Sequence, residues 1–156
     1  MILLMKKVDT RLMLDRIISS INESEGALIP VAGHSMEPFL KDGRDQIYLL
    51  APKQNVVYKP GDIVLFQREN GQYVLHRIAM ASEKLLMIWG DNQLNAEPVK
   101  PVQVKAVVSK AKCSGHWITP ENLVWKFFAG PWNRAVWLRR TAAWMHRIFH
   151  RQKRTD

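Results

Sequence analysis

The central part of the chain alternates short apolar runs with polar turn residues. Six runs have the length and composition of β-strands: ALIPVAG (27–33), IYLLA (47–51), KPGDIVLFQ (59–67), YVLHRIAMA (73–81), KLLMIWGDN (84–92) and VQVKAVVSKAK (102–112). Glycine, proline and asparagine separate these runs, and Asn70-Gly71 is typical of a β-hairpin turn. Short strands at this spacing predict a mainly β fold with a coiled, mostly antiparallel sheet.

The N-terminal segment combines helical periodicity with a short apolar start. Residues 9–22 carry aliphatic side chains at helical spacing, namely Leu12, Ile17, Ile18 and Ile21. This pattern predicts a short amphipathic helix packed on the β domain. The opening run MILLM is far shorter than the ~20 apolar residues that cross a bilayer, and shorter than the core of a signal peptide. We therefore expect no transmembrane anchor in this chain.

The C-terminal segment is predicted to be helical and basic. Residues 121–129 are expected to form a short helix that ends at Gly130-Pro131, and residues 132–151 a second, amphipathic helix. One face of the second helix is mainly aromatic and aliphatic, and the other carries most of its arginines. This pattern is typical of a helix that lies on an anionic membrane surface. Docking of the apolar face on the β domain is the main alternative, and a nucleic-acid interface is less favoured.

Charge and cysteine content refine this outline into three parts: an N-terminal helix (1–26), a β domain (27–119) and a basic helical tail (120–156). The chain has 23 Lys+Arg and 14 Asp+Glu, and residues 120–156 contain eight of the basic and two of the acidic side chains. A basic tail indicates an anionic partner. The single cysteine, Cys113, excludes an intrachain disulfide and supports no zinc site. We expect a cytoplasmic protein, peripheral on the membrane, with no metal or cofactor.

Four short motifs follow one another within sixty residues: GHSMEP (33–38), PGDIV (60–64), VLHRI (74–78) and GDN (90–92). In this order they resemble the signal peptidase I superfamily, which includes the self-cleaving SOS repressors. The resemblance extends from about residue 28 to residue 108 and implies a signal-peptidase-like fold. A histidine followed by Arg-Ile is similar to the endoplasmic-reticulum and archaeal branch, in which histidine replaces lysine as the general base. The resemblance thus implies Ser35 as nucleophile and His76 as general base.

The chemistry of these residue types agrees with those roles. A serine hydroxyl is a poor nucleophile at neutral pH and needs an adjacent base, and an imidazole can take its proton and return it to the leaving amine. A third group should orient the ring and stabilise its charged form. Asp91 in the GDN motif is the first candidate. In the histidine branch an aspartate some residues further on serves as the acid, and because this region reads QLNAEPV here, Glu97 is the alternative. A dyad with neither acid is the third option.

The remaining residues of the motifs are expected to shape the site. Some family members have a serine hydroxyl at the oxyanion two residues before the nucleophile, where this chain has Gly33, so the backbone N–H of Ser35 and a neighbouring N–H should hold the oxyanion. Met36 and Pro38 are expected to wall the cleft that binds substrate. Asp62 should cap a turn. Arg77 should lie on the opposite strand face from His76.

These expectations together describe a serine endopeptidase that cuts a peptide bond in a leader-like or signal-like segment at the membrane surface. The substrate would pair with a strand edge in extended form, and a membrane-protein partner could supply the anchor. Two alternatives remain. One is a catalytically silent peptide-binding module of the same fold. The other is a self-cleaving regulator, which is less favoured because the SOS repressors pair serine with lysine and carry a DNA-binding domain.

Overall fold

The computed structural model describes residues 2–135, with side chains from Thr10 onward. The predicted amphipathic helix 132–151 therefore lies largely outside the described residues. In chain order the elements are α1 (Ile2–Ser20), β1 (Ala27–Pro30), β2 (Gln46–Leu50), β3 (Ile63–Gln67), β4 (Tyr73–Ala81), β5 (Leu86–Trp89), β6 (Glu97–Val99), the 3-10 turn η1 (Pro101–Gln103), β7 (Val104–Cys113), β8 (His116–Ile118), α2 (Leu123–Phe127) and the π-helical turn η2 (Phe128–Trp132).

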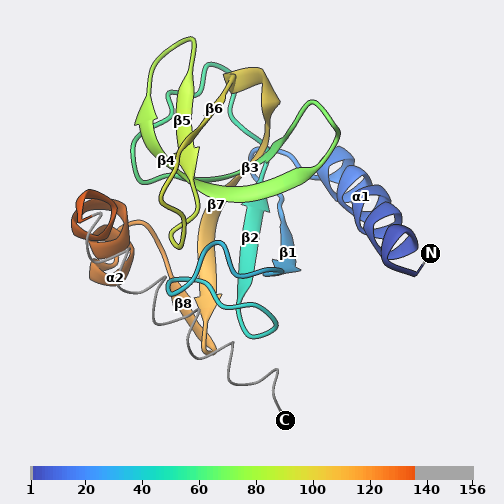
Figure 1. Cartoon of the computed structure of the whole chain (residues 1–156), viewed down its shortest axis with the longest axis horizontal. Coiled ribbons are helices and arrows are strands. Elements are labelled where there is room, and N and C mark those ends of the chain that lie inside the picture. The colour runs from blue at the N-terminus through green and yellow to red at the C-terminus, as the bar shows by residue number, and fades with distance from the viewer. Residues whose placement is uncertain (1, 136–156) are drawn as a thin grey trace.

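All the strands belong to one antiparallel sheet, in the order β1-β2-β7-β3-β4-β5-β6, with β8 paired to β7 (Figure 1). The mainly β, antiparallel prediction is confirmed, and β6 and β8 are strands that the sequence did not predict. The ladders shift register in β2·β7, β3·β7 and β4·β5. Such bulges bend strands and increase their twist. Accordingly, β4 runs across the direction of β2 and β7 in Figure 1.

The sheet is apolar on both faces, and this places successive residues of β4 in different surroundings. In β3, Ile63 and Leu65 belong to one buried cluster, whereas Val64 and Phe66 belong to the other. Across the β3·β4 ladder, Val64 pairs with His76 and Ile63 pairs with Arg77. Directly opposed residues of an antiparallel pair share a face. His76 and Arg77 therefore lie on opposite faces of the sheet, as predicted.

Helix α1 packs on the sheet along a stripe that differs from the predicted one by one residue. The side chains in contact with the core are Leu14, Ile17, Ile18 and Ile21, which recur at the spacing of one helix face. Leu12, predicted to face the domain, is 55% exposed. The helix also begins at Ile2 and not at residue 9. The Tyr73 hydroxyl donates a hydrogen bond to Asp15 Oδ1 at 2.5 Å and so ties α1 to β4.

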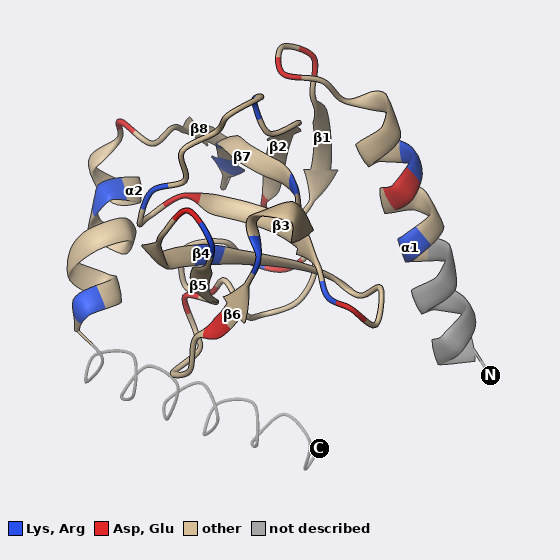
Figure 2. Ribbon diagram, turned by 90° about the horizontal axis from the view of Figure 1, so that it is seen from above, with Lys and Arg blue, Asp and Glu red and all other residues tan. Residues whose placement is uncertain are grey.

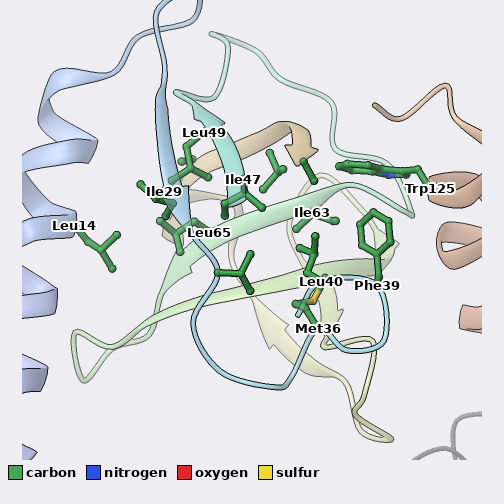
Figure 3. Packing of buried hydrophobic residues seen from close by; sticks show 14 of the residues in the cluster. Leu14, Ile29, Met36, Phe39, Leu40, Ile47, Leu49, Ile63, Leu65 and Trp125 are labelled. Atoms are coloured by element: carbon green, nitrogen blue, oxygen red, sulfur yellow. The ribbon is translucent and has the colours of Figure 1, made fainter. Parts of the chain in front are cut away.

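The start of the predicted tail is part of the packed domain. Trp125 of α2 is buried and meets the Phe39 ring edge-on at 5.4 Å, as the core view in Figure 3 shows. The Trp132 indole donates a hydrogen bond to the backbone oxygen of Asp91 at 2.9 Å. Gly130-Pro131 was predicted to end the helix, but η2 continues helically through both residues. The boundary predicted at residue 120 is therefore not the end of packed structure.

Helices α1 and α2 lie at opposite ends of the molecule in both views (Figures 1 and 2), and both contribute side chains to the same buried cluster. Basic and acidic residues are both distributed over several elements of the ribbon in Figure 2. In the described part of the chain, no helix is both long enough and apolar enough to span a membrane.

Candidate active site

Ser35 and His76, which are 41 positions apart in the sequence, line the same cavity of about 260 Å³. Its walls come from the segment after β1, from the β3–β4 hairpin and from the turn after β5: Val31, Ala32, Gly33, Ser35, Met36, Arg68, Gln72, Tyr73, Val74, Leu75, His76 and Gln93. Within the described part of the chain, the two side chains are not joined by a hydrogen bond. Catalytic hydrogen bonds are often long without substrate and tighten when it binds. The fold thus brings the predicted nucleophile and base to one site.

The backbone of Ser35 is held by the GDN turn. Asn92 N–H donates to the Ser35 carbonyl oxygen at 2.9 Å, and the Asn92 side chain donates to the His34 carbonyl oxygen at 3.4 Å. Gly90 lies so close that a Cβ there would be 2.3 Å from the Ser35 carbonyl oxygen. Real Cβ atoms do not approach backbone oxygen so closely, so only glycine fits. The turn after β5 therefore fixes the position of the serine.

The N–H of Ser35 is available for a developing oxyanion. Gly33 adopts a φ of +86°, which side-chain-bearing residues rarely adopt, and its N–H donates to Asp42 Oδ1 at 2.9 Å. Within residues 2–135, nothing accepts a hydrogen bond from the N–H of Ser35. This geometry is compatible with the predicted oxyanion role of the Ser35 backbone.

His76 is almost completely buried, at 2% exposure, and its Nδ1 is the atom of interest. The nearest carboxylate oxygen, Glu97 Oε1, lies 3.7 Å from Nδ1, which is beyond hydrogen-bond distance. In the described structure Nδ1 has no hydrogen-bond partner. Burial lowers the pKa of His76 to about 4, Glu97 opposes this effect, and the charge of Arg68 adds to it. The ring is therefore neutral at neutral pH, the state that a general base requires.

Asp91, the first candidate for the third catalytic group, is engaged elsewhere. Its two carboxylate oxygens accept hydrogen bonds from Nε and one terminal nitrogen of Arg77, each at 2.8 Å, and both side chains are fully buried. The acid beside the His76 ring is Glu97, which projects from β6. The geometry thus favours the alternative acid, Glu97, over the first choice. The reason is topological: Asp91 lies on the Arg77 side of β4, whereas Glu97 reaches the His76 side.

Arg77 joins three of the four motifs to one another, a role that the sequence did not reveal. Besides the contact with Asp91 of GDN, it donates to the carbonyl oxygen of Gly61 in PGDIV at 3.0 Å. Its guanidinium carbon lies 4.9 Å from the centre of the Phe39 ring, just after the serine motif. Asp62, as predicted, caps a turn by accepting a hydrogen bond from the Lys59 N–H at 2.8 Å. Residues of three motifs therefore meet around one buried arginine.

The two residues predicted to wall the substrate cleft have different positions. Met36 is 2% exposed and lines the cavity, while also packing in the core in Figure 3. Pro38 is exposed and lies outside the cavity lining, so its predicted contact with substrate is not supported. Sequence reasoning missed Arg68, which lines the cavity and forms a two-pronged ion pair with Glu97. Nothing in the local pattern marks this pair, because its members are 29 residues apart.

Comparisons of the chain with family models, with curated proteins and with solved structures found no match. Over the described residues, no group of three His, Cys, Asp or Glu side chains is arranged to hold a metal ion. The groups at the site that could take part in chemistry are therefore the serine hydroxyl, the imidazole and the glutamate carboxylate.

Proposed function

We propose that this protein is a serine endopeptidase of the signal-peptidase type that cleaves a peptide bond in a leader-like or signal-like segment. One observation carries the proposal. Ser35 and His76 line a common cavity, and the carboxylate of Glu97 lies behind the ring on its Nδ1 side. Nucleophile, base and acid in this order are the arrangement that activates a serine hydroxyl.

In the first half of the reaction, the Ser35 oxygen attacks the carbonyl carbon of the scissile bond. Nε2 of His76 takes the hydroxyl proton, since Nδ1 faces Glu97. The negative charge on the carbonyl oxygen is stabilised by the Ser35 N–H. His76 then gives its proton to the leaving amine as the carbon–nitrogen bond breaks, which leaves an acyl-enzyme on Ser35.

In the second half, water replaces the amine. The oxygen of the water attacks the ester while His76 removes one of the water's protons. His76 later returns that proton to the Ser35 oxygen as the ester bond breaks. The products are a carboxylic acid and the free enzyme. Glu97 acts in both halves by stabilising the imidazolium, with a contact that must shorten from 3.7 Å in each half.

The size of the cavity suits a substrate with small side chains next to the scissile bond. A volume of about 260 Å³, shared with the reacting groups, leaves little room beyond the wall that Met36 and Leu75 form. An extended peptide could add its backbone hydrogen bonds at a strand edge near this cavity. We therefore expect substrates with alanine, glycine or serine at the cleavage point.

The decisive test is labelling by a fluorophosphonate, a probe that acylating serines attack. The full chain should be labelled on Ser35, and Ser35→Ala should not be labelled. His76→Ala should react at least about 10³-fold more slowly, because the base is lost. If the wild type is not labelled but still binds peptide, the protein is instead a silent peptide-binding module.

We also propose that the protein acts at an anionic membrane surface. The predicted amphipathic helix lies outside the described residues, but α2 supports this location: Leu123, Val124 and Phe127 are 82%, 49% and 45% exposed beside Lys126. Apolar side chains next to basic ones suit an interfacial position. Phe127→Ser should reduce sedimentation with phosphatidylglycerol vesicles relative to the wild type, whereas Val102→Ser, at an equally apolar exposed site on η1, should not. Equal sedimentation of all three proteins would contradict a role of α2.

A further inference from the structure

Arg68, immediately after β3, holds the carboxylate of Glu97, which also lies near His76. Its Nε donates to Glu97 Oε2 at 2.9 Å, and one terminal nitrogen donates to Oε1 at 2.6 Å. The same Oε1 is the atom that lies 3.7 Å from His76 Nδ1. The other terminal nitrogen of Arg68 donates to the Gln72 side chain at 2.9 Å, so both sides of the guanidinium are held. Glu97 is thus anchored by arginine and only approached by the imidazole.

Few groups act on the His76 ring besides these two. Glu97 approaches from β6 and Arg68 from the end of β3, and they are the charged groups that influence its proton affinity in the described structure. From β3 the aromatic ring of Phe66 lies 6.2 Å from the imidazole and contributes no charge. Ser35 lines the same cavity as the ring and carries no charge. Burial is the main influence on the proton affinity of this ring, and one carboxylate and one guanidinium act on it in opposite directions.

We propose that Arg68 is a positioning residue that holds Glu97 just out of hydrogen-bond distance from His76 in the resting site. This inference rests on the proposed peptidase function. When Ser35 gives up its proton, the imidazolium competes with Arg68 for Oε1, and a small movement of Glu97 completes the contact. The side chains of Arg68 and Glu97 are 35% and 30% exposed, so their pair is hydrated and able to rearrange.

The site of the ion pair allows substrate to influence it. Arg68 lines the cavity that holds Ser35 and His76, and Arg68 and Glu97 both line a second cavity of about 600 Å³ together with Phe66, Leu85, Val99 and Lys100. A peptide that fills either space removes water from the pair. Because Coulomb interactions strengthen when water is excluded, the competition between arginine and imidazolium for Glu97 becomes sharper once substrate is bound.

The experiment compares the wild type with Arg68→Gln and Arg68→Lys by two measurements on the full chain. The first is the pKa of His76 by NMR, with the signal assigned among the five histidines by its loss in His76→Gln. The second is the rate of fluorophosphonate labelling as a function of pH. Arg68→Gln should raise the pKa of His76 by about one unit or more, since a nearby positive charge is lost and Glu97 is released. The acid limb of the labelling profile should move to higher pH by the same amount.

Arg68→Lys keeps the charge but not the two-pronged contact, so a smaller rise in pKa and a slower labelling rate are expected. Arg44→Gln is the matched control, because Arg44 also makes a two-pronged contact with an aspartate, Asp45, outside the cavity lining. It should leave both measurements unchanged. An unmoved His76 pKa and acid limb in folded Arg68→Gln would reduce Arg68 to a structural role. If the wild type is not labelled at any pH, the peptidase proposal fails, while the NMR titration still decides whether Arg68 controls His76.

Discussion

His76 and Arg77 are neighbours in β4, and each carries a basic side chain that meets a carboxylate from the region after β5. On one face, Arg77 and Asp91 form two hydrogen bonds of 2.8 Å, and neither side chain is exposed. On the other face, Glu97 stays 3.7 Å from His76, whose Nδ1 has no hydrogen-bond partner in the described structure. The two faces of one strand therefore hold a satisfied pair and an unsatisfied one.

This difference distinguishes a supporting ion pair from a candidate reactive group. The groups of a buried, fully hydrogen-bonded ion pair are not available to bind a substrate, and removal of one partner would strongly destabilise the fold. A buried imidazole nitrogen without a partner costs stability, and groups with perturbed pKa values cluster at functional sites. The sequence motifs contain both kinds of residue side by side, so only the pairing distinguishes them.

Asp91→Asn should have the largest effect on stability, because it leaves the buried charge of Arg77 without its counter-ion. We expect a loss of about 3–5 kcal/mol in the free energy of unfolding, measured by urea denaturation at neutral pH. Glu69→Gln is the matched control, since Glu69 is exposed, and its effect should be small. An Asp91→Asn variant as stable as the wild type would mean that the Arg77 face is not the supporting one.

Acidification should destabilise the fold through His76. Burial lowers the pKa of this side chain from 6.5 to about 4. Below pH 6.5 the unfolded chain therefore binds a proton at His76, whereas the folded chain binds it only below about pH 4. Stability therefore falls as the pH drops through this window, by about 3 kcal/mol from this group alone. Urea unfolding at pH 7 and pH 4.5 measures the loss. His76→Gln should lose less over the same interval, and an equal loss in both proteins would exclude His76 as the source.

Glu97→Gln should change catalysis more than folding. The ion pair with Arg68 is partly exposed, so we expect the free energy of unfolding to change by no more than about 1 kcal/mol. The imidazolium formed during acylation loses its counter-charge, and fluorophosphonate labelling should slow by roughly 10²-fold. The acid limb of the labelling profile should move to lower pH, because Glu97 normally raises the pKa of His76. Unaltered labelling would leave a Ser-His dyad without an acid.

The strands that the sequence predicted and those that it missed differ in a physical way. Tyr73–Ala81 was predicted with its observed bounds, since it is long and bounded by turn residues on the N-terminal side. The strand β6 consists of Glu97, Pro98 and Val99, too short for any alternation and interrupted by a proline. The strand β6 forms because it pairs with β5, and its proline is tolerated because β6 lies at the edge of the sheet. In helix α1, likewise, tertiary contacts determine that Leu14 is buried and Leu12 is exposed.

The candidate site shows the same division. Ser35 and His76 followed from the motifs, and the fold places them at one cavity. The choice between Asp91 and Glu97 could not be made from spacing, because it depends on how the chain crosses from one face of the sheet to the other between β5 and β6. Arg68 was missed for a related reason, as its partner is distant in sequence. Pairs of charges that meet only in three dimensions leave no local signal.

The contact between Gly90 and the Ser35 carbonyl oxygen has a consequence for chains that share these motifs. Any side chain at this position would collide with the backbone that carries the hydroxyl, at 2.3 Å for the first carbon atom alone. In the proposed peptidase, a single methyl group at this position would thus displace the nucleophile while every reacting atom stays in the sequence. When such chains are sorted into active and inactive forms, the residue before the aspartate is as informative as the serine itself.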